Sequence, residues 1–415
     1  MRAEAQPHWI DASADEPQTK ELLVDVSVIA FHDAGTGIQR VTRAIFNEFK
    51  RLHLSEFKVR PVAASRTIDY HYLPDDFSIG TARPDLSAFE RVRPHQGSVF
   101  LGLDLASMIM PHHERQLVAW RQAGMAIHIF LFDMLPLLHG EWFRAAARRN
   151  FRRWLRVVER QADTVICQCP TVADQFERWN NRWWPPIPRR RLKTLSIPLS
   201  GELSGSVPSM GLPDNVKAIE NWMARKHTIL MVGTVEPRKG YDQALAAFEL
   251  LWRQSPANAP QLMIIGKAGW KTGSLQKKLR ERSSIDGPLL WISDATDELL
   301  ERIYSRASLL LFASRGEGFG LPIPEALHRG LPVLFRDLPE LKQFVGPGTA
   351  QFKAATHQDL AHAIIEWLNN PPADTAGNSH AHRNWDAVAI ELANALQLRL
   401  APRQIWDRLS TAMVN

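Results

Sequence analysis

The chain has 415 residues, of which 45% are hydrophobic and 23% charged, and its formal net charge is +6. This length exceeds that of one ordinary hydrophobic core, so two domains of roughly 200 residues are expected. The composition excludes a disordered or fibrous protein. The positive charge favours anionic partners, without choosing among phosphate esters, a membrane surface and nucleic acid.

The sequence lacks an expected targeting segment, and its two cysteines are not expected to form a disulfide, which favours a reducing compartment. Residues 1–20 contain no apolar run long enough for a signal peptide, and we expect a flexible N-terminus there. The longest apolar stretch, 124–140, is interrupted by polar residues and is short for a membrane span. Cys167 and Cys169 alternate along one expected strand and cannot easily bridge each other. We therefore expect a cytoplasmic protein, soluble or peripheral on the inner face of the membrane.

Apolar, β-rich runs alternate with helical patterns over nearly the whole chain. In the first half we expect strands at 21–31, 57–64, 98–104, 126–134, 163–169 and 193–199. In the second half we expect them at 227–234, 261–267, 288–293, 308–314 and 332–337. Runs that are apolar throughout are typical of sheets buried on both faces. The pattern predicts an α/β protein with two Rossmann-like, doubly wound parallel-sheet domains that face each other across a cleft.

The domain boundaries follow from changes in composition. A segment rich in Gly, Ser and Pro separates the two halves and is expected to be a linker. The predicted segments are a flexible N-terminus (1–20), an N-terminal acceptor domain (21–200), a linker (201–215), a C-terminal donor domain (216–395) and a C-terminal helix that returns to the N-terminal domain (396–415).

A glycine-rich loop follows the first expected strand. In "FHDAGTGIQRVTRAIF", Gly35 and Gly37 form a tight turn before an amphipathic helix. Backbone N–H groups at the start of a helix suit an anion. A plain strand-to-helix turn explains the segment equally well, so both interpretations stay open.

A basic pair follows the first strand of the second half. In "VGTVEPRKGYDQAL", the strand ends at Gly233, and Arg238 and Lys239 precede Gly240 and a helix. An arginine fork and a lysine beside a helix start could clamp a diphosphate. Exposed basic pairs are more often simply solvated, but the position after a strand of a doubly wound sheet favours a ligand site.

Two glutamates stand eight residues apart in "SRGEGFGLPIPEALHRG". Prolines at 322 and 324 predict a helix start, with Glu325 in its first turn and Glu317 in the preceding loop. Carboxylates accept hydrogen bonds from vicinal hydroxyls, so the pair could hold two sugar rings. For Glu325 alone, complementing the helix dipole is the more ordinary role.

Further polar and basic features lie in the first half. Asp133 ends an expected apolar strand and is expected to face the cleft, and Asp104 is a weaker case of the same kind. Two segments rich in arginine and tryptophan, 142–160 and 178–193, suit an anionic membrane surface. A surface helix with its arginines in water explains them equally well.

Taken together and in this order, these motifs resemble the family 4 glycosyltransferases, which are retaining enzymes with the GT-B fold. The segments "EPRKG", "GKAGW", "EGFGLPIPE" and "GLPVLFRDLPEL" match the C-terminal domain of that family, and "EGFGLPIPE" matches its E-x7-E signature. The N-terminal segments "GTGIQRVTRAI" and "FDMLPLLHGEWF" match more loosely. Phe132 stands where the family often has a histidine before the aspartate that matches Asp133.

The resemblance implies a role for each matching residue. It assigns catalysis to Glu317, Asp133, Lys239 and Arg238. The donor would be bound by Gly37, Gly233, Arg238, Lys239, Lys267, Glu317, Gly318, Phe319, Gly320, Leu321 and Glu325. Within this set, Glu317 would hold the donor sugar, Glu325 the ribose, and the basic pair the diphosphate. The candidates on the acceptor side are Asp104, Gln39 and Arg40.

The resemblance also implies the reaction. A sugar, with mannose or rhamnose favoured, would move with retention from a GDP-, dTDP- or UDP-linked donor to a glycan or lipid-linked acceptor in surface polysaccharide synthesis. No metal or other cofactor is expected. The alternatives are a non-catalytic nucleotide-sugar or glycan-binding protein on the same fold, and a nucleic-acid-binding protein, for which no recognised module is present.

Overall fold

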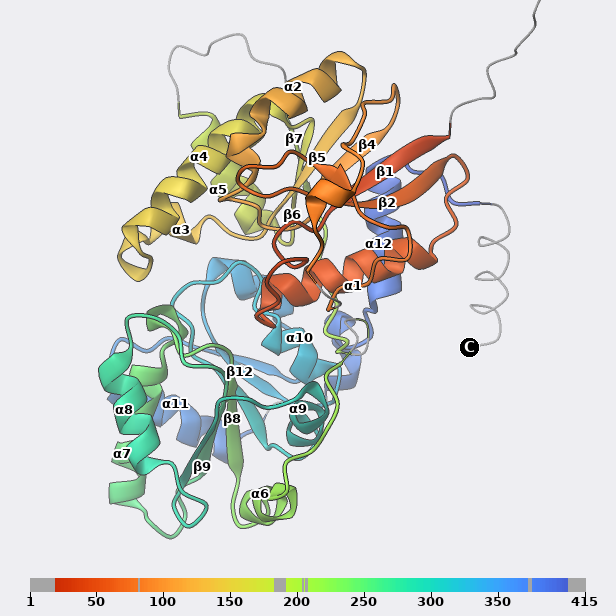
Figure 1. The fold of residues 1–415 in the computed structure, drawn as a ribbon. Helices are drawn as coiled ribbons and strands as arrows, with labels where there is room; N and C mark the ends of the chain where they lie inside the picture. The colour runs from red at the N-terminus through yellow and green to blue at the C-terminus, as the bar shows by residue number, and fades with distance from the viewer. Residues whose placement is uncertain are drawn as a thin grey trace, which may run out of the picture.

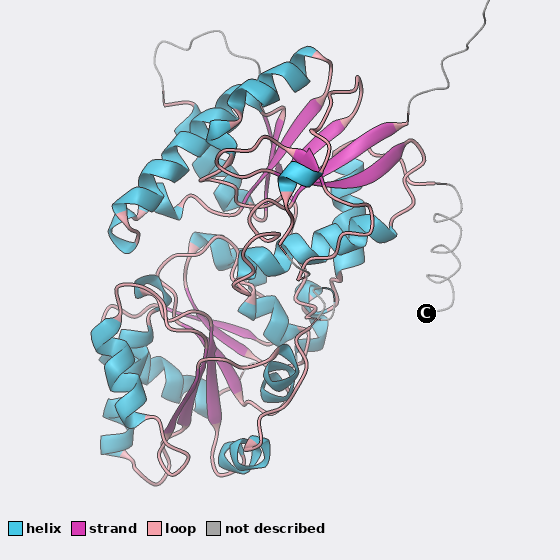
Figure 2. Ribbon diagram, in the orientation of Figure 1, coloured by secondary structure: helices cyan, strands magenta, loops and turns pink. Residues whose placement is uncertain are grey.

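The computed structural model describes residues 19–80, 83–182, 192–203, 205, 208–371 and 375–401. Two α/β domains are stacked one above the other, and their sheets lie in separate layers flanked by helices (Figures 1 and 2). The predictions for residues 1–18, 183–191 and 402–415 fall outside the described residues.

The N-terminal domain is built on a seven-stranded sheet of order β3-β2-β1-β4-β5-β6-β7. All neighbouring strands are parallel except β3, which runs antiparallel to β2. The strands are β1 (Lys20–Asp25), β2 (Phe57–Ala63), β3 (His71–Tyr72), β4 (Val99–Gly102), β5 (Ala126–Leu131), β6 (Thr164–Cys167) and β7 (Lys193–Ser196). The helices are α1 (Gly37–Arg51), α2 (Glu114–Gln122), α3 (Leu135–Leu138), α4 (Ala145–Gln161) and α5 (Pro170–Asn180).

The C-terminal domain is built on a six-stranded parallel sheet of order β10-β9-β8-β11-β12-β13. Its strands are β8 (Thr228–Val232), β9 (Gln261–Ile265), β10 (Leu289–Ile292), β11 (Leu309–Phe312), β12 (Val333–Arg336) and β13 (Thr349–Phe352). The helices are α6 (Val216–Met223), α7 (Tyr241–Gln254), α8 (Gly273–Arg282), α9 (Asp297–Tyr304), α10 (Pro322–Leu327), α11 (His357–Asn369) and α12 (Trp385–Ala395).

The first strand is shorter than the apolar sequence predicted. It ends at Asp25 rather than at residue 31. Two buried carboxylates bind the backbone that follows: Asp25 accepts from the N–H of Ser27, and Asp104 accepts from the N–H groups of Val28 and Ile29. Because these N–H groups are satisfied by side chains, the chain turns while its apolar residues stay buried.

The hydrophobic core runs through both domains. One cluster extends from β1, β4 and α1 across the domain boundary to α9, α10 and α12. Two further clusters cover the outer faces of the sheets, under α2, α4 and α5 in the N-terminal domain and under α7 and α11 in the C-terminal domain. Burial of apolar surface across the boundary holds the two domains together.

The C-terminal part of the described chain returns to the N-terminal domain. Helix α12 lies alongside α1 (Figure 1), and Leu400 forms an antiparallel bridge with Leu54. The domain boundary predicted at residue 395 stays a prediction. Helix α12, which precedes that boundary, packs against α1 of the N-terminal domain. No described helix has the length and apolar character needed to cross a membrane.

Candidate active site

The candidate site lies where the strand order of the C-terminal sheet reverses. The neighbours β8 and β11 occupy the middle of this sheet, and the chain leaves them in opposite directions, to β9 and to β12. Open α/β sheets bind ligands at the carboxyl ends of strands at such a point. The segment 233–239 follows β8 and the segment 314–321 follows β11, so topology brings the two strongest sequence motifs together.

Glu317 pairs with both cations of the basic motif. Its Oε1 lies 2.6 Å from Lys239 Nζ, and its Oε2 lies 2.8 Å from a terminal nitrogen of Arg238. Glu317 is 5% exposed. Arg238 also donates from Nε to Glu236, at 3.0 Å, and to the carbonyl oxygen of Gly316, at 3.2 Å. The cations are therefore held in fixed positions.

Electrostatics keep Glu317 ionised although it is buried. Burial alone would raise the pKa of Glu317, but Arg238 and Lys239 lower that pKa to about 2. Burial, and then the charge of Arg238, lower the pKa of Lys239, whereas Glu317 opposes this shift. Burial would also lower the pKa of Arg238, but Glu317, Glu236 and Asp133 raise it. Charged partners offset the cost of removing these groups from water.

Asp133 approaches the same cluster from the N-terminal domain. It follows β5, and its Oδ1 accepts a 2.9 Å hydrogen bond from the N–H of Leu135. Burial raises the pKa of Asp133 to about 6, although the charge of Arg238 acts to lower it. The strand end thus places a carboxyl group that titrates near pH 6 within the electrostatic reach of Arg238 and Glu317.

Gly318 lets the two domains approach closely. A Cβ at this position would lie 2.1 Å from the carbonyl oxygen of Phe132 and 2.7 Å from Nε2 of Gln168, both in the N-terminal domain. The thiol of Cys169 donates to the carbonyl oxygen of Gly318 at 3.2 Å. Only glycine allows backbone contact at this distance. The loop between the two glutamates is therefore also a contact between the domains.

Glu325 is held by a second set of partners. Its Oε1 accepts from Arg40 at 2.6 Å, its Oε2 accepts from the Tyr304 hydroxyl at 2.7 Å, and it is 2% exposed. Arg40 lies on α1 of the N-terminal domain and also pairs with Asp297 at 2.9 Å. Arg40, expected on the acceptor side, thus contacts the glutamate expected on the donor side.

The glycine-rich loop before α1 is organised by Gln39. Its Oε1 accepts from the backbone N–H groups of Ala34 and Thr36, and its Nε2 donates to the carbonyl oxygen of His32. Thr36 caps α1 in a reciprocal capping box with Gln39. These contacts make Gln39 a structural part of the loop.

This loop meets the C-terminal domain at two points. Lys267 Nζ donates to the carbonyl oxygen of Ala34 at 2.8 Å. A Cβ on Gly37 would lie 3.2 Å from Cδ1 of Leu321, so the start of α1 borders the loop after β11. Gly37 therefore borders Leu321 of the loop 318–321, which we call the proposed donor loop, whereas Lys267 contacts the glycine-rich loop that leads to Gly37.

Asp104 lies apart from the cluster around Glu317. It is fully buried, and its two oxygens accept three hydrogen bonds from backbone N–H groups of Val28, Ile29 and Leu105. Burial raises its pKa to about 6, although these hydrogen bonds act to lower it. The contacts support a structural role in the turn after β1.

The structure adds residues that the motifs did not single out. Glu236 stands two positions before Arg238, within the motif itself, and could have been recognised there as a partner. Tyr304 and Asp297 gave no signal, because their partners are distant in the sequence. At the edge of the domain contact, Trp270 donates to the carbonyl oxygen of Trp142 at 2.7 Å.

Comparisons with known proteins bear on this geometry. Residues 214–383 match the family model of the glycosyl transferases group 1. This segment is a glycosyl transferases group 1 domain. It contains Glu236, Arg238, Lys239, Glu317 and Glu325, so the whole cluster after β8 and β11 lies inside the matched segment.

Two relatives from Escherichia coli extend the likeness beyond this domain. The chain is 38% identical to the serotype-specific mannosyltransferase WbdA over 354 residues, which is 84% of this chain and 41% of WbdA. It is 32% identical to the O-antigen chain mannosyltransferase B over 55% of this chain and 54% of that protein. The chain thus spans about two fifths to half of the length of these relatives.

Solved structures support the fold. The structure resembles Anabaena Alr3699/HepE, solved with UDP and glucose, with a TM-score of 0.59 and 16% identity over 91% of this chain and 99% of that chain. It resembles sucrose-phosphate synthase from Thermosynechococcus elongatus with a TM-score of 0.60 and 18% identity, over 95% of this chain and all of that chain. The predicted GT-B fold of two facing α/β domains is confirmed.

Proposed function

We propose that this chain is a retaining glycosyltransferase of polysaccharide synthesis, which transfers a hexose from a nucleotide diphosphate sugar to a hydroxyl of a glycan. Mannose is favoured because the relatives WbdA and O-antigen chain mannosyltransferase B are named as mannosyltransferases. A nucleotide diphosphate carrier is favoured because a structure of the same fold holds UDP and glucose. GDP, dTDP and UDP all remain to be tested as the carrier.

The cluster of Glu317, Arg238 and Lys239 carries this proposal. Two cations, 17% and 11% exposed and fixed at 2.8 Å and 2.6 Å from one carboxylate, form a site prepared for the charge of a diphosphate. In the reaction, the bond between the anomeric carbon and the diphosphate oxygen breaks, and a bond to the acceptor oxygen forms. The acceptor proton passes to the departing diphosphate, whose developing charge is stabilised by the two cations.

The remaining residues take roles that their positions support. Glu317 and the backbone of 318–321 bind the sugar, and Glu325 binds the ribose hydroxyls. Asp133, at the end of β5, binds a hydroxyl on the acceptor side of the cluster. Arg40 orients Glu325 by donating to its Oε1 at 2.6 Å.

The test is a transfer assay with the full chain. GDP-mannose, UDP-glucose and dTDP-rhamnose are each incubated with a mannose-containing oligosaccharide, and nucleotide release and product mass are followed. We expect transfer from one donor, and its loss in Lys239→Ala and Glu317→Gln. The control Glu281→Gln alters an exposed pair with Lys277 in the same domain and should transfer at the normal rate. Tight nucleotide binding without transfer would favour the alternative, a nucleotide-sugar-binding protein.

Retention of the anomeric configuration and independence from a metal need separate measurements. The anomeric configuration of the product, determined by NMR, tests retention. Transfer that persists in excess EDTA tests independence from a metal. The described residues contain no group of three or more His, Cys, Asp or Glu side chains that could hold a metal ion.

A further inference from the structure

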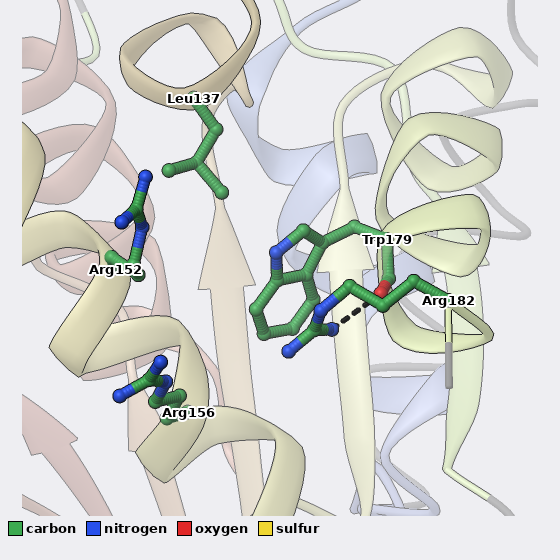
Figure 3. A pocket seen from close by; sticks show the side chains of 5 residues that line it. All are labelled: Leu137, Arg152, Arg156, Trp179 and Arg182. Atoms are coloured by element: carbon green, nitrogen blue, oxygen red, sulfur yellow. Dashed lines mark hydrogen bonds between the residues drawn. The ribbon is translucent and has the colours of Figure 1, made fainter. Parts of the chain in front are cut away.

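A pocket of the N-terminal domain lies outside the candidate active site. It has a volume of about 370 Å³ and is lined by Leu137, Arg152, Arg156, Trp179 and Arg182, which we call the arginine pocket. Figure 3 shows the two arginines of α4 on one side of this space, and Trp179 with Arg182 on the other. Three helices, α3, α4 and α5, thus contribute to one pocket.

The lining of the arginine pocket does not balance the charge of Arg152 and Arg156. Among the described residues that line it, none is acidic. Within the described part of the chain, no ion pair forms at Arg152 or Arg156, and both side chains are exposed. They stand one helical turn apart, an arrangement in which like charges repel. The neighbouring pocket on α4 differs, because Arg160 there pairs with Glu114 at 2.7 Å.

The third arginine is held in place by an aromatic ring. The guanidinium carbon of Arg182 lies 3.7 Å from the centre of the Trp179 ring, and Arg182 also donates to the carbonyl oxygen of Trp179. Glu159 lies 3.7 Å from Arg182, but it does not line the pocket. A stacked guanidinium loses little freedom when it binds an anion, which suits recognition of a phosphate.

Apolar groups surround these cations. Leu137 and Trp179 form the apolar part of the lining. The next residue of α3, Leu138, is 49% exposed, and Met108, beside the neighbouring pocket, is 53% exposed. The opposite face of α4 packs on the sheet through Phe151, Trp154, Leu155 and Val158. Exposed apolar side chains beside arginines favour a ligand with both a phosphate and a hydrocarbon part.

We propose that the arginine pocket binds the phosphate or diphosphate group of a lipid headgroup. Arg152 and Arg156 contact the phosphate oxygens, Arg182 closes the opposite side, and Leu137 and Leu138 meet the lipid chains. Binding at this surface does not require sugar transfer, so a failed transfer assay leaves the proposal standing, and the reverse also holds.

Vesicle flotation with the full chain tests the arginine pocket. The vesicles contain phosphatidylcholine alone, or with phosphatidic acid or phosphatidylserine at matched surface charge. We expect binding to phosphatidic acid vesicles to exceed binding to the others. The double variant R152A/R156A should bind these vesicles on the order of thirtyfold more weakly, because it removes the two arginines that contact the phosphate oxygens.

The matched control is R149A/R153A, two exposed arginines of the same helix that do not line the arginine pocket. It should bind phosphatidic acid vesicles nearly as well as the unmodified chain. Equal loss in the two double variants would overturn the proposal, because diffuse surface charge would then explain binding. Equal binding to phosphatidylserine vesicles would also overturn it.

Inorganic pyrophosphate distinguishes the source of the phosphate. If the pocket takes a lipid phosphate, pyrophosphate should displace the unmodified chain from phosphatidic acid vesicles. Pyrophosphate binding that depends on Arg152 and Arg156, without any vesicle binding, would overturn the lipid as the source. Absence of binding to both probes would overturn the site. Circular dichroism of each double variant verifies that the fold is unchanged.

Discussion

Replacing Glu317 by glutamine should destabilise the protein by a predictable amount. The substitution keeps the size of the side chain and removes its charge, which leaves Arg238 and Lys239, largely shielded from water, beside a neutral amide. Both cations lie within 2.8 Å of the native carboxylate. Removing one partner from a buried ion pair costs about 3–5 kcal/mol.

The lowered pKa gives an independent magnitude. Its fall from 4.5 to about 2 corresponds to roughly 3 kcal/mol of stability at neutral pH, at about 1.4 kcal/mol for each pH unit. Because the pKa is depressed in the folded state, this contribution is complete above about pH 4.5, the unfolded value. It is lost as the pH falls through about 2. The two magnitudes agree, so we expect a loss of about 3 kcal/mol at pH 7.

Urea denaturation of the native chain and of Glu317→Gln measures this difference. The gap in unfolding free energy should be about 3 kcal/mol at pH 7 and should narrow between pH 4.5 and pH 3. The control Glu281→Gln removes an exposed pair with Lys277 and should cost less than about 1 kcal/mol. A gap for Glu317→Gln no larger than that of the control, or one that stays constant down to pH 3, would refute the reasoning.

Three further substitutions have distinct expected outcomes. Asp133→Asn should raise the melting temperature above pH 6, because ionising this carboxyl of raised pKa costs stability there. Protonation of Asp133 should slow transfer below about pH 6, and pH–rate profiles should show that Asp133→Asn removes this pH dependence. Gly318→Ala should reduce the transfer rate by on the order of a hundredfold, since its Cβ would lie 2.1 Å from the Phe132 carbonyl oxygen and force the domains apart; kinetics combined with small-angle scattering would measure both effects. Arg40→Lys should lower stability by about 1–2 kcal/mol in urea denaturation, because a lysine cannot donate to Glu325 and a second carboxylate from one planar fork; an unchanged midpoint would show that the pairing contributes nothing.

The sequence predicted features whose causes are local. Parallel strands buried on both faces are recognisable in the sequence as apolar runs. The prolines before Glu325 correctly predicted the start of α10. The strand β13 was missed because only its last residue is buried. Lying at the edge of the sheet, it carries no apolar run.

The sequence could predict that residues of the candidate site lie together only where they belong to short motifs. Arg238, Lys239 and Glu317 stand close to strand ends, and the doubly wound topology brings those ends together. The partner of Glu325 could not be found this way, because Arg40 lies 285 positions away and the pairing depends on how the two domains meet. The sequence pattern also could not reveal that both carboxylate oxygens of Asp104 accept hydrogen bonds from backbone N–H groups.

The two glutamates of the motif therefore differ in which domain supplies their counter-charge. Both cations at Glu317 come from the C-terminal domain, so its charge is compensated however the domains are arranged. The cation at Glu325 comes from α1, whose first residue, Gly37, also borders Leu321 of the donor loop. Two contacts within one turn of α1 thus fix this helix against the loop that carries both glutamates. Substitution of Arg40 should consequently disturb the alignment of the domains, whereas substitution of Glu317 should disturb the charges that we propose meet the donor.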